Sequence, residues 1–105
     1  MWTVEYLREA IEDIKRLDQE QRIQVIKAVI KVSVNPLPQA EGGYGKPLGN
    51  KNGVNLTGYC KIKLLKLGLR VVYNIVRESN IMKVIIVSAR ADDEVYILAN
   101  RRKDK

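Results

Sequence analysis

Residues 58–90, with the sequence GYCKIKLLKLGLRVVYNIVRESNIMKVIIVSAR, decide the fold of this chain. β-Branched and aromatic residues recur throughout this segment, which is typical of strands. Gly68 and the run 78–80 (Glu-Ser-Asn) are turn residues that divide it. The pattern therefore predicts three strands, over residues 59–67, 69–77 and 81–89. Because short turns join consecutive strands, we expect an antiparallel meander.

A strand and a first helix are predicted before the meander. Trp2, Val4 and Tyr6 alternate with polar neighbours, which indicates a short strand over residues 1–6 that packs through these side chains. Apolar residues then recur at helical spacing and predict a helix of about three turns. These residues are Leu7, Ala10, Ile11, Ile14 and Leu17.

A second helix is predicted to follow after a short joint, so that the two helices form a hairpin. Asp18 with Gln21 three residues later resembles a capping box, which marks the start of a helix. The dipeptide Asn35-Pro36 ends it, because the residue before a proline disfavours helical backbone. The apolar face of this helix is expected at Ile23, Ile26, Ile30 and Val34.

Residues 37–56 contain two prolines and five glycines, which is typical of a loop. The GxxxxGK[ST] pattern of a phosphate-binding loop does not occur, and no strand is predicted before this stretch. We therefore expect a connecting loop.

A short helix is predicted after the meander. Asp92 and Asp93 favour a helix start, and the polar run 100–105 is expected to be frayed. One face of the helix carries Val95, Leu98 and Ala99. Residues 1–105 are thus expected to form one α+β domain, with an N-terminal strand, a helical hairpin, an antiparallel meander that completes a small sheet, and a short C-terminal helix. The helices are expected on one face of the sheet.

Composition excludes several classes of protein. Hydrophobic residues make up 46% and charged residues 30% of the 105, which is a globular composition. No apolar run approaches the ~18–20 residues of a bilayer span, so no membrane partner is expected. The N-terminus lacks the basic-then-apolar layout of a secretory signal. The single cysteine, Cys60, cannot form an internal disulfide and is expected to be buried, so a reducing, cytoplasmic location is predicted.

The net charge of +7 is concentrated in the second part of the chain. Residues 61–105 hold 11 Lys and Arg against 5 Asp and Glu, whereas residues 1–60 hold 8 against 7. A basic surface on a small domain indicates a polyanionic partner. An acidic protein partner, or a basic surface that only confers solubility, would give the same composition.

The chain contains no histidine, which excludes a Ser-His-Asp triad and a histidine-pair nuclease. One cysteine without histidine also excludes the common zinc sites. The acidic run 92–94 is interpreted as the start of a helix and not as a metal site. No metal or cofactor is expected.

Basic residues within the apolar strands are the remaining candidates for chemistry. Because strand side chains alternate, Tyr59, Lys61 and Lys63 share one face, opposite Cys60. The further candidates are Arg70, Arg90 and Tyr96. The alternative is a solvated outer face, since antiparallel sheets commonly have one.

The stretch 56–96, and especially GYCKIKLLKLGLRVVYNI and VSARADDEVY, resembles the RelE family of bacterial toxins. The family pattern has a Lys-x-Lys strand, an Arg before a Val-Tyr pair, an Arg after the last strand and a Tyr six residues later. This chain has Lys61, Lys63, Arg70, Arg90 and Tyr96 at those positions. The resemblance implies a toxin that cleaves mRNA in the ribosomal A site and is neutralised by a cognate antitoxin protein.

Two other functions remain open from the sequence. ParE-type toxins resemble RelE toxins in fold but poison DNA gyrase. They generally lack the full set of basic residues and tyrosine that the RelE pattern has. A non-enzymatic nucleic-acid-binding module could use the same basic face.

The RelE resemblance implies attack of a 2′-hydroxyl on the adjacent phosphate, without a metal. Lys63 is a candidate general base, because neighbouring positive charges favour the neutral form of an amine. Tyr96 competes for that role and can also stack on a base. Arg70 fits a bidentate phosphate clamp, Lys61 stabilises the transition state, and Arg90 neutralises the leaving oxygen.

The antitoxin is expected to cover the basic face or to displace the short helix that carries Tyr96. The motivation is that few contacts hold this helix in the sequence-based view, because it is short, terminal and followed by a polar run.

Overall fold

The computed structural model describes residues 1–51, 54–89 and 92–103. Strand β1 (Thr3–Tyr6) leads into a hairpin of two helices, α1 (Arg8–Lys15) and α2 (Gln19–Ser33). The following strands are β2 (Lys46–Lys51), β3 (Val54–Leu64), β4 (Leu69–Val76) and β5 (Ile81–Ser88). Helix α3 (Asp92–Arg102) comes after the last strand. This is the α+β order predicted from the sequence.

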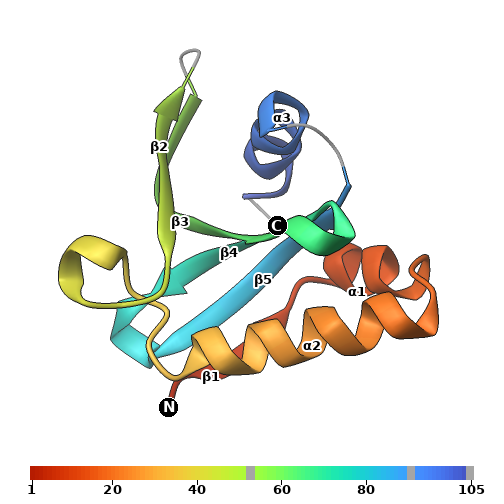
Figure 1. Cartoon of the computed structure of the whole chain (residues 1–105). Helices are drawn as coiled ribbons and strands as arrows, with labels where there is room; N and C mark the ends of the chain where they lie inside the picture. Colours follow the sequence, from red (N-terminus) through yellow and green to blue (C-terminus); the bar gives the residue numbers. More distant parts are fainter. Residues whose placement is uncertain (52–53, 90–91, 104–105) are drawn as a thin grey trace.

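The described strands form a single five-stranded sheet with the order β1-β5-β4-β3-β2. The strands from β2 to β5 pair antiparallel with their neighbours in the chain, which confirms the meander. The first strand, β1, pairs in parallel with the last strand, β5, and so lies at one edge of the sheet. The hairpin of β2 and β3 projects beyond the rest of the molecule (Figure 1).

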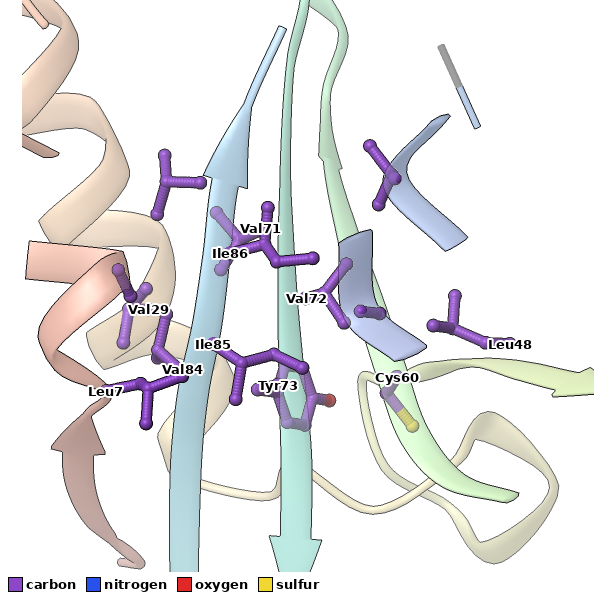
Figure 2. Packing of buried hydrophobic residues seen from close by; sticks show 14 of the residues in the cluster. Leu7, Val29, Leu48, Cys60, Val71, Val72, Tyr73, Val84, Ile85 and Ile86 are labelled. Atoms are coloured by element: carbon purple, nitrogen blue, oxygen red, sulfur yellow. The ribbon is translucent and has the colours of Figure 1, made fainter. Parts of the chain in front are cut away.

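Helices cover both faces of the sheet, and the prediction that all of them lie on one face is wrong. The hairpin of α1 and α2 packs on one face, which we call the hairpin face (Figure 1). Helix α3 lies against the other face, the α3 face, where Val72 points toward it (Figure 2). None of the helices in the described ranges has both the length and the apolar character that a membrane-spanning helix needs.

The capping box at the start of α2 is confirmed. The Asp18 carboxylate accepts a hydrogen bond from the Gln21 amide at 2.8 Å, and the Gln21 side chain accepts one from the Asp18 amide at 3.2 Å. The capping box therefore satisfies two backbone amides that the helix itself cannot pair.

The apolar face predicted for α2 is wrong. The fully buried face consists of Val25, Val29 and Val32, whereas Ile30 is 51% exposed. Ile23 and Val34 of the predicted face are exposed as well. The physical reason is that apolar residues occur all around this helix, so two stripes fit a period of 3.6 residues equally well.

The predicted loop over residues 37–56 is partly wrong, because it contains β2 and the first residues of β3. Pro47 lies in β2, which is an edge strand, and a proline is tolerated there because no neighbour requires its missing N–H. The pairing with β3 is irregular between Pro47 and Gly49, and Gly49 has a φ of 65°. Glycine and proline therefore mark a bulged edge strand here and not only a loop.

The ends of the predicted strands shift by a few residues. β3 ends at Leu64, and Leu65–Leu67 form a 3-10 turn before Gly68, whose φ of 66° confirms the predicted turn. A second 3-10 turn, Arg77–Ser79, follows β4 and ends at Asn80, which has a φ of 53°. Both turns hold the neighbouring strands in antiparallel register.

Tyr73 is fully buried in the core and ties the loop after α2 to the sheet (Figure 2). Its hydroxyl donates a hydrogen bond to the carbonyl oxygen of Pro36 at 2.7 Å. Gly45 passes so close that a Cβ there would collide with the Tyr73 hydroxyl and with Cys60. Trp2 and Tyr6 are partly buried against the same core, which confirms that they pack.

The C-terminal helix extends further than predicted. α3 continues to Arg102, so the expected fraying over residues 100–102 is wrong. The reason is a contact far away in the sequence, in which the Arg102 guanidinium pairs with the buried carboxylate of Asp13 on α1. Val95 and Ala99 are fully buried and confirm the predicted apolar face.

Candidate active site

Lys61 and Lys63 share one face of the sheet, as predicted, and Arg70 lies on the same face. Lys63 on β3 lies directly opposite Arg70 on β4, and Arg70 lies opposite Ser88 on β5. We call Lys63, Arg70 and Ser88 the cross-strand row. Lys61 precedes Lys63 by two residues and therefore shares its face, the α3 face.

The cross-strand row concentrates positive charge. Residues opposite one another in an antiparallel pair have Cβ atoms about 4.5–5.5 Å apart, and like charges at that distance destabilise a sheet. Lys63 and Arg70 are both half-buried, so solvent screens them less than it screens a surface pair. Cations gathered in this way attract anions such as a phosphate group.

Tyr96 is brought to the basic residues by α3. The Lys61 Nζ donates a hydrogen bond to the Tyr96 hydroxyl at 3.1 Å, and the same Nζ lies 5.4 Å from the centre of the tyrosine ring. The two residues are 35 apart in the sequence, and Tyr96 is only 9% exposed. The contact therefore places a phenol oxygen beside the Lys-x-Lys strand in a nearly dry position.

Arg90, the remaining predicted residue, lies outside the described residues. Ser88, which lies opposite Arg70, was missed by the sequence interpretation. A hydroxyl in this position can donate a hydrogen bond to a phosphate oxygen or to a ribose.

The arrangement can bind and polarise a phosphate diester. The Arg70 guanidinium can donate two parallel hydrogen bonds to phosphate oxygens. The two lysines add compact positive charges on the same face. In the described ranges, His, Cys, Asp and Glu side chains do not gather in threes as a metal site would need.

Cys60 and Tyr73 lie on the opposite side of β3 and β4 from the basic residues, and burial keeps both neutral. Burial raises the pKa of the Cys60 thiol to about 11, and burial likewise raises the pKa of the Tyr73 phenol. At neutral pH the Cys60 thiol is therefore protonated and does not act as a nucleophile. Both side chains serve packing.

Comparison with known proteins identifies the family. The chain is 32% identical over 103 residues to an Escherichia coli RelE-like toxin protein, and the match covers 96% of both chains. It belongs to the RelE-like toxins. The resemblance predicted from residues 56–96 is thereby confirmed, although no family model matches the chain.

Solved structures share the fold of this RelE-like toxin over nearly its whole length. The isolated E. coli RelE toxin in its P21 crystal form is 26% identical, with a TM-score of 0.70, and the match covers 98% of this chain and 99% of that one. An E. coli RelE mutant in the free state is also 26% identical, with a TM-score of 0.73 and 96% of each chain covered. The intact E. coli RelBE toxin–antitoxin complex has the same fold at 23% identity, with a TM-score of 0.68, over 87% of this chain and 99% of that one.

Proposed function

We propose that this RelE-like toxin is an endoribonuclease that cleaves mRNA in the ribosomal A site and so inhibits translation. In this reaction a ribose 2′-hydroxyl loses its proton, and its oxygen attacks the adjacent phosphorus. The bond between phosphorus and the 5′-oxygen breaks, and the 5′-oxygen takes up a proton. The products are a 2′,3′-cyclic phosphate, or the 3′-phosphate formed from it by water, and a 5′-hydroxyl end.

The observation that carries the proposal is the meeting of a lysine pair, an arginine and a tyrosine hydroxyl on one face. Lys61 contacts the Tyr96 hydroxyl at 3.1 Å, and Lys63 lies opposite Arg70. Arg70 would clamp the scissile phosphate, and Lys61 would stabilise the added negative charge. Lys63 and Tyr96 are the two candidates for the general base. Arg90 would neutralise the leaving 5′-oxygen.

The ribosome would supply the orientation that a small open surface lacks. Holding a strand in a reactive geometry removes much of the entropic cost of the reaction. The excess of Lys and Arg over Asp and Glu in residues 61–105 would also favour contact with ribosomal RNA, because phosphate contacts dominate the affinity of basic proteins for nucleic acids.

A reconstituted translation reaction tests the proposal. The wild-type protein is added to programmed ribosomes, and new 5′-hydroxyl ends of the mRNA are mapped by ligation-based sequencing. We expect Lys63→Ala to lower the cleavage rate by about 10²- to 10⁴-fold, as for loss of a general base or a phosphate contact. The matched control is Lys27→Ala, which removes the same charge from an exposed position on α2.

The outcomes separate three functions. New 5′-hydroxyl ends with wild type and Lys27→Ala, but not with Lys63→Ala, support the nuclease. If the mRNA stays intact and DNA supercoiling by gyrase is inhibited, the protein is a gyrase poison and not a nuclease. RNA binding without new ends would leave a non-enzymatic binding module.

We also propose that a cognate antitoxin protein neutralises this toxin. The E. coli relative of the same fold has been crystallised in the RelBE toxin–antitoxin complex. A partner that covers the α3 face should be acidic there, because that face carries Lys61, Lys63 and Arg70. On adding the product of a neighbouring acidic gene, slower hydrogen exchange of β3 and α3 amides would support covering of this face, and faster exchange of α3 would support displacement of the helix. Unchanged exchange of both elements would contradict the proposal.

A further inference from the structure

Asp13 and Arg102 form a buried ion pair at the edge of β5. The Arg102 Nη1 lies 2.8 Å from the Asp13 Oδ2, and the Nη2 lies 3.4 Å from the Oδ1. The two side chains are only 12% and 8% exposed. Asp13 belongs to α1 on the hairpin face and Arg102 to α3 on the other face, so the pair joins the two helical layers around the edge of the sheet.

The pair also satisfies the backbone of β5 where the sheet has no further strand. β1 pairs with β5 only as far as Val84. Beyond it, the Val87 amide donates to the Asp13 Oδ2 at 3.0 Å, and the Ile85 carbonyl accepts from the Arg102 Nη1 at 2.8 Å. Carboxylate and guanidinium thus replace the acceptor and the donor of a missing strand.

A bulge in β5 makes this arrangement possible. Val72 lies opposite Ile86 and Tyr73 lies opposite Val84, so Ile85 is an extra residue on β5. A bulge leaves the extra residue outside the regular ladder. The Ile85 carbonyl is consequently available to the Arg102 guanidinium.

Arg102 continues the buried stripe of α3. It follows Val95 and Ala99 at positions i, i+4 and i+7, which lie on one side of a helix. The helix has 11 residues, about 16 Å in length. It is therefore held at its fifth residue by the contact between Tyr96 and Lys61, and at its last residue by Arg102. A helix held at two points cannot pivot about one contact.

We propose that Arg102, acting through Asp13, is a positioning residue that holds Tyr96 against Lys61 during mRNA cleavage. The inference rests on the proposed nuclease function, but the hold on α3 can be measured without RNA. The pair also contacts Val87, the neighbour of Ser88, and so supports the end of the cross-strand row.

The first measurement is hydrogen exchange of the α3 backbone amides in the full-length protein. Arg102→Gln and Asp13→Asn should raise the exchange rates of α3 by about tenfold or more, because local opening then costs less free energy. Amides of β4 should stay protected, which shows that the variants are folded. The control is Arg101→Gln, which removes the same charge from the exposed neighbouring residue and should change nothing. Unchanged α3 exchange in Arg102→Gln would overturn the inference.

The second measurement is mRNA cleavage on ribosomes. Arg102→Gln should lower kcat by about 10- to 100-fold and leave KM unchanged, because misplacement of a reacting group affects the chemical step. Arg102→Lys, which keeps the charge, should recover part of the loss and is the variant to use if Arg102→Gln unfolds.

A double-mutant cycle with Tyr96→Phe distinguishes positioning from a general structural effect. If Arg102 acts through Tyr96, Arg102→Gln should have less than about a twofold further effect on kcat in the Tyr96→Phe protein. Equal losses in both backgrounds would overturn the positioning role. If the wild type cleaves no mRNA, the nuclease function is overturned. The hydrogen-exchange rates of α3 would then still test whether Arg102 holds the helix in place.

Discussion

The two faces of the sheet are covered in different ways. On the hairpin face, α2 contributes a stripe of fully buried valines that includes Val25 and Val29. On the α3 face, one short helix buries Val95 and Ala99. Polar contacts also hold it, among them those between Lys61 and Tyr96 and between Arg102 and Asp13. Apolar contact is spread over many side chains, whereas a polar contact is lost with a single substitution. We therefore expect the hairpin face to maintain the fold, and single contacts of α3 to be removable without unfolding of the domain.

The largest expected effect compares two adjacent residues of α2. Val29→Asp should lower the free energy of unfolding by about 3–5 kcal/mol, because it places an unpaired charge in the core. Ile30→Asp should change it by less than about 0.5 kcal/mol, because that side chain is 51% exposed. Urea unfolding of both variants measures the difference. Equal losses would mean that the buried side of α2 is not the one that carries Val29.

The next effect concerns pH and the buried thiol beneath the basic residues. The folded-state pKa of Cys60 is about 11, against an ordinary value of 9.0, so the unfolded chain loses the thiol proton first. The stabilising contribution is therefore complete below pH 9 and is lost as the pH rises to 11. Between pH 9 and 11 we expect the free energy of unfolding of the wild type to fall by about 2–3 kcal/mol more than that of Cys60→Ala.

Urea unfolding at pH 8, 10 and 11 measures this loss in both proteins. Tyr73, whose pKa burial also raises, is present in both, so the difference between the two curves reports Cys60. If the free energy of unfolding falls equally with pH in both proteins, the Cys60 thiol is not in a dry environment.

A smaller effect is expected on the α3 face when charge is kept but geometry is changed. Arg70→Lys retains the positive charge opposite Lys63 but loses the planar pair of donors. We expect cleavage to fall about tenfold, the loss of one charge-assisted hydrogen bond, with stability unchanged. Full activity of Arg70→Lys would show that the positive charge at this position is sufficient and that a bidentate clamp is not needed.

The smallest effect is expected at an exposed ion pair far from both helical layers. The Arg77 guanidinium donates to both carboxylate oxygens of Glu41, at 2.9 and 2.7 Å. These hydrogen bonds lower the pKa of Glu41, yet water surrounds both side chains and screens the pair. Arg77→Gln should leave Tm within the error of a thermal melt. A clear drop in Tm would mean that this pair holds the loop before β2 in place.

Local patterns predicted the meander and the lysine strand well, because alternation and turn residues act over a few positions. Lys61 and Lys63 share a face through strand parity alone, and Gly68 turns as expected. The buried side of α2 could not be chosen, since Val29 and Ile30 are equally apolar and only the packed sheet distinguishes them.

Contacts between distant residues were beyond the reach of these patterns. Asp13 and Arg102 are 89 residues apart, and each looks like an ordinary exposed charge on a helix. The edge strand β2 was hidden for another reason, because Pro47 and Gly49 are turn residues in most contexts. The contact at the end of α3 was missed on the same account, since the partner of Arg102 comes from the start of the chain.

The parallel pairing of β1 with β5 has a consequence for the order of events during synthesis. Thr3 lies opposite Ile81, so the first strand leaves the ribosome long before its partner exists. Pairing across such a separation is slow, because a long loop must close first. The candidate catalytic residues are also made late, between Lys61 and Tyr96. A nascent chain therefore has neither a complete sheet nor a complete site, and under the proposed function it cannot cleave the message from which it is being translated.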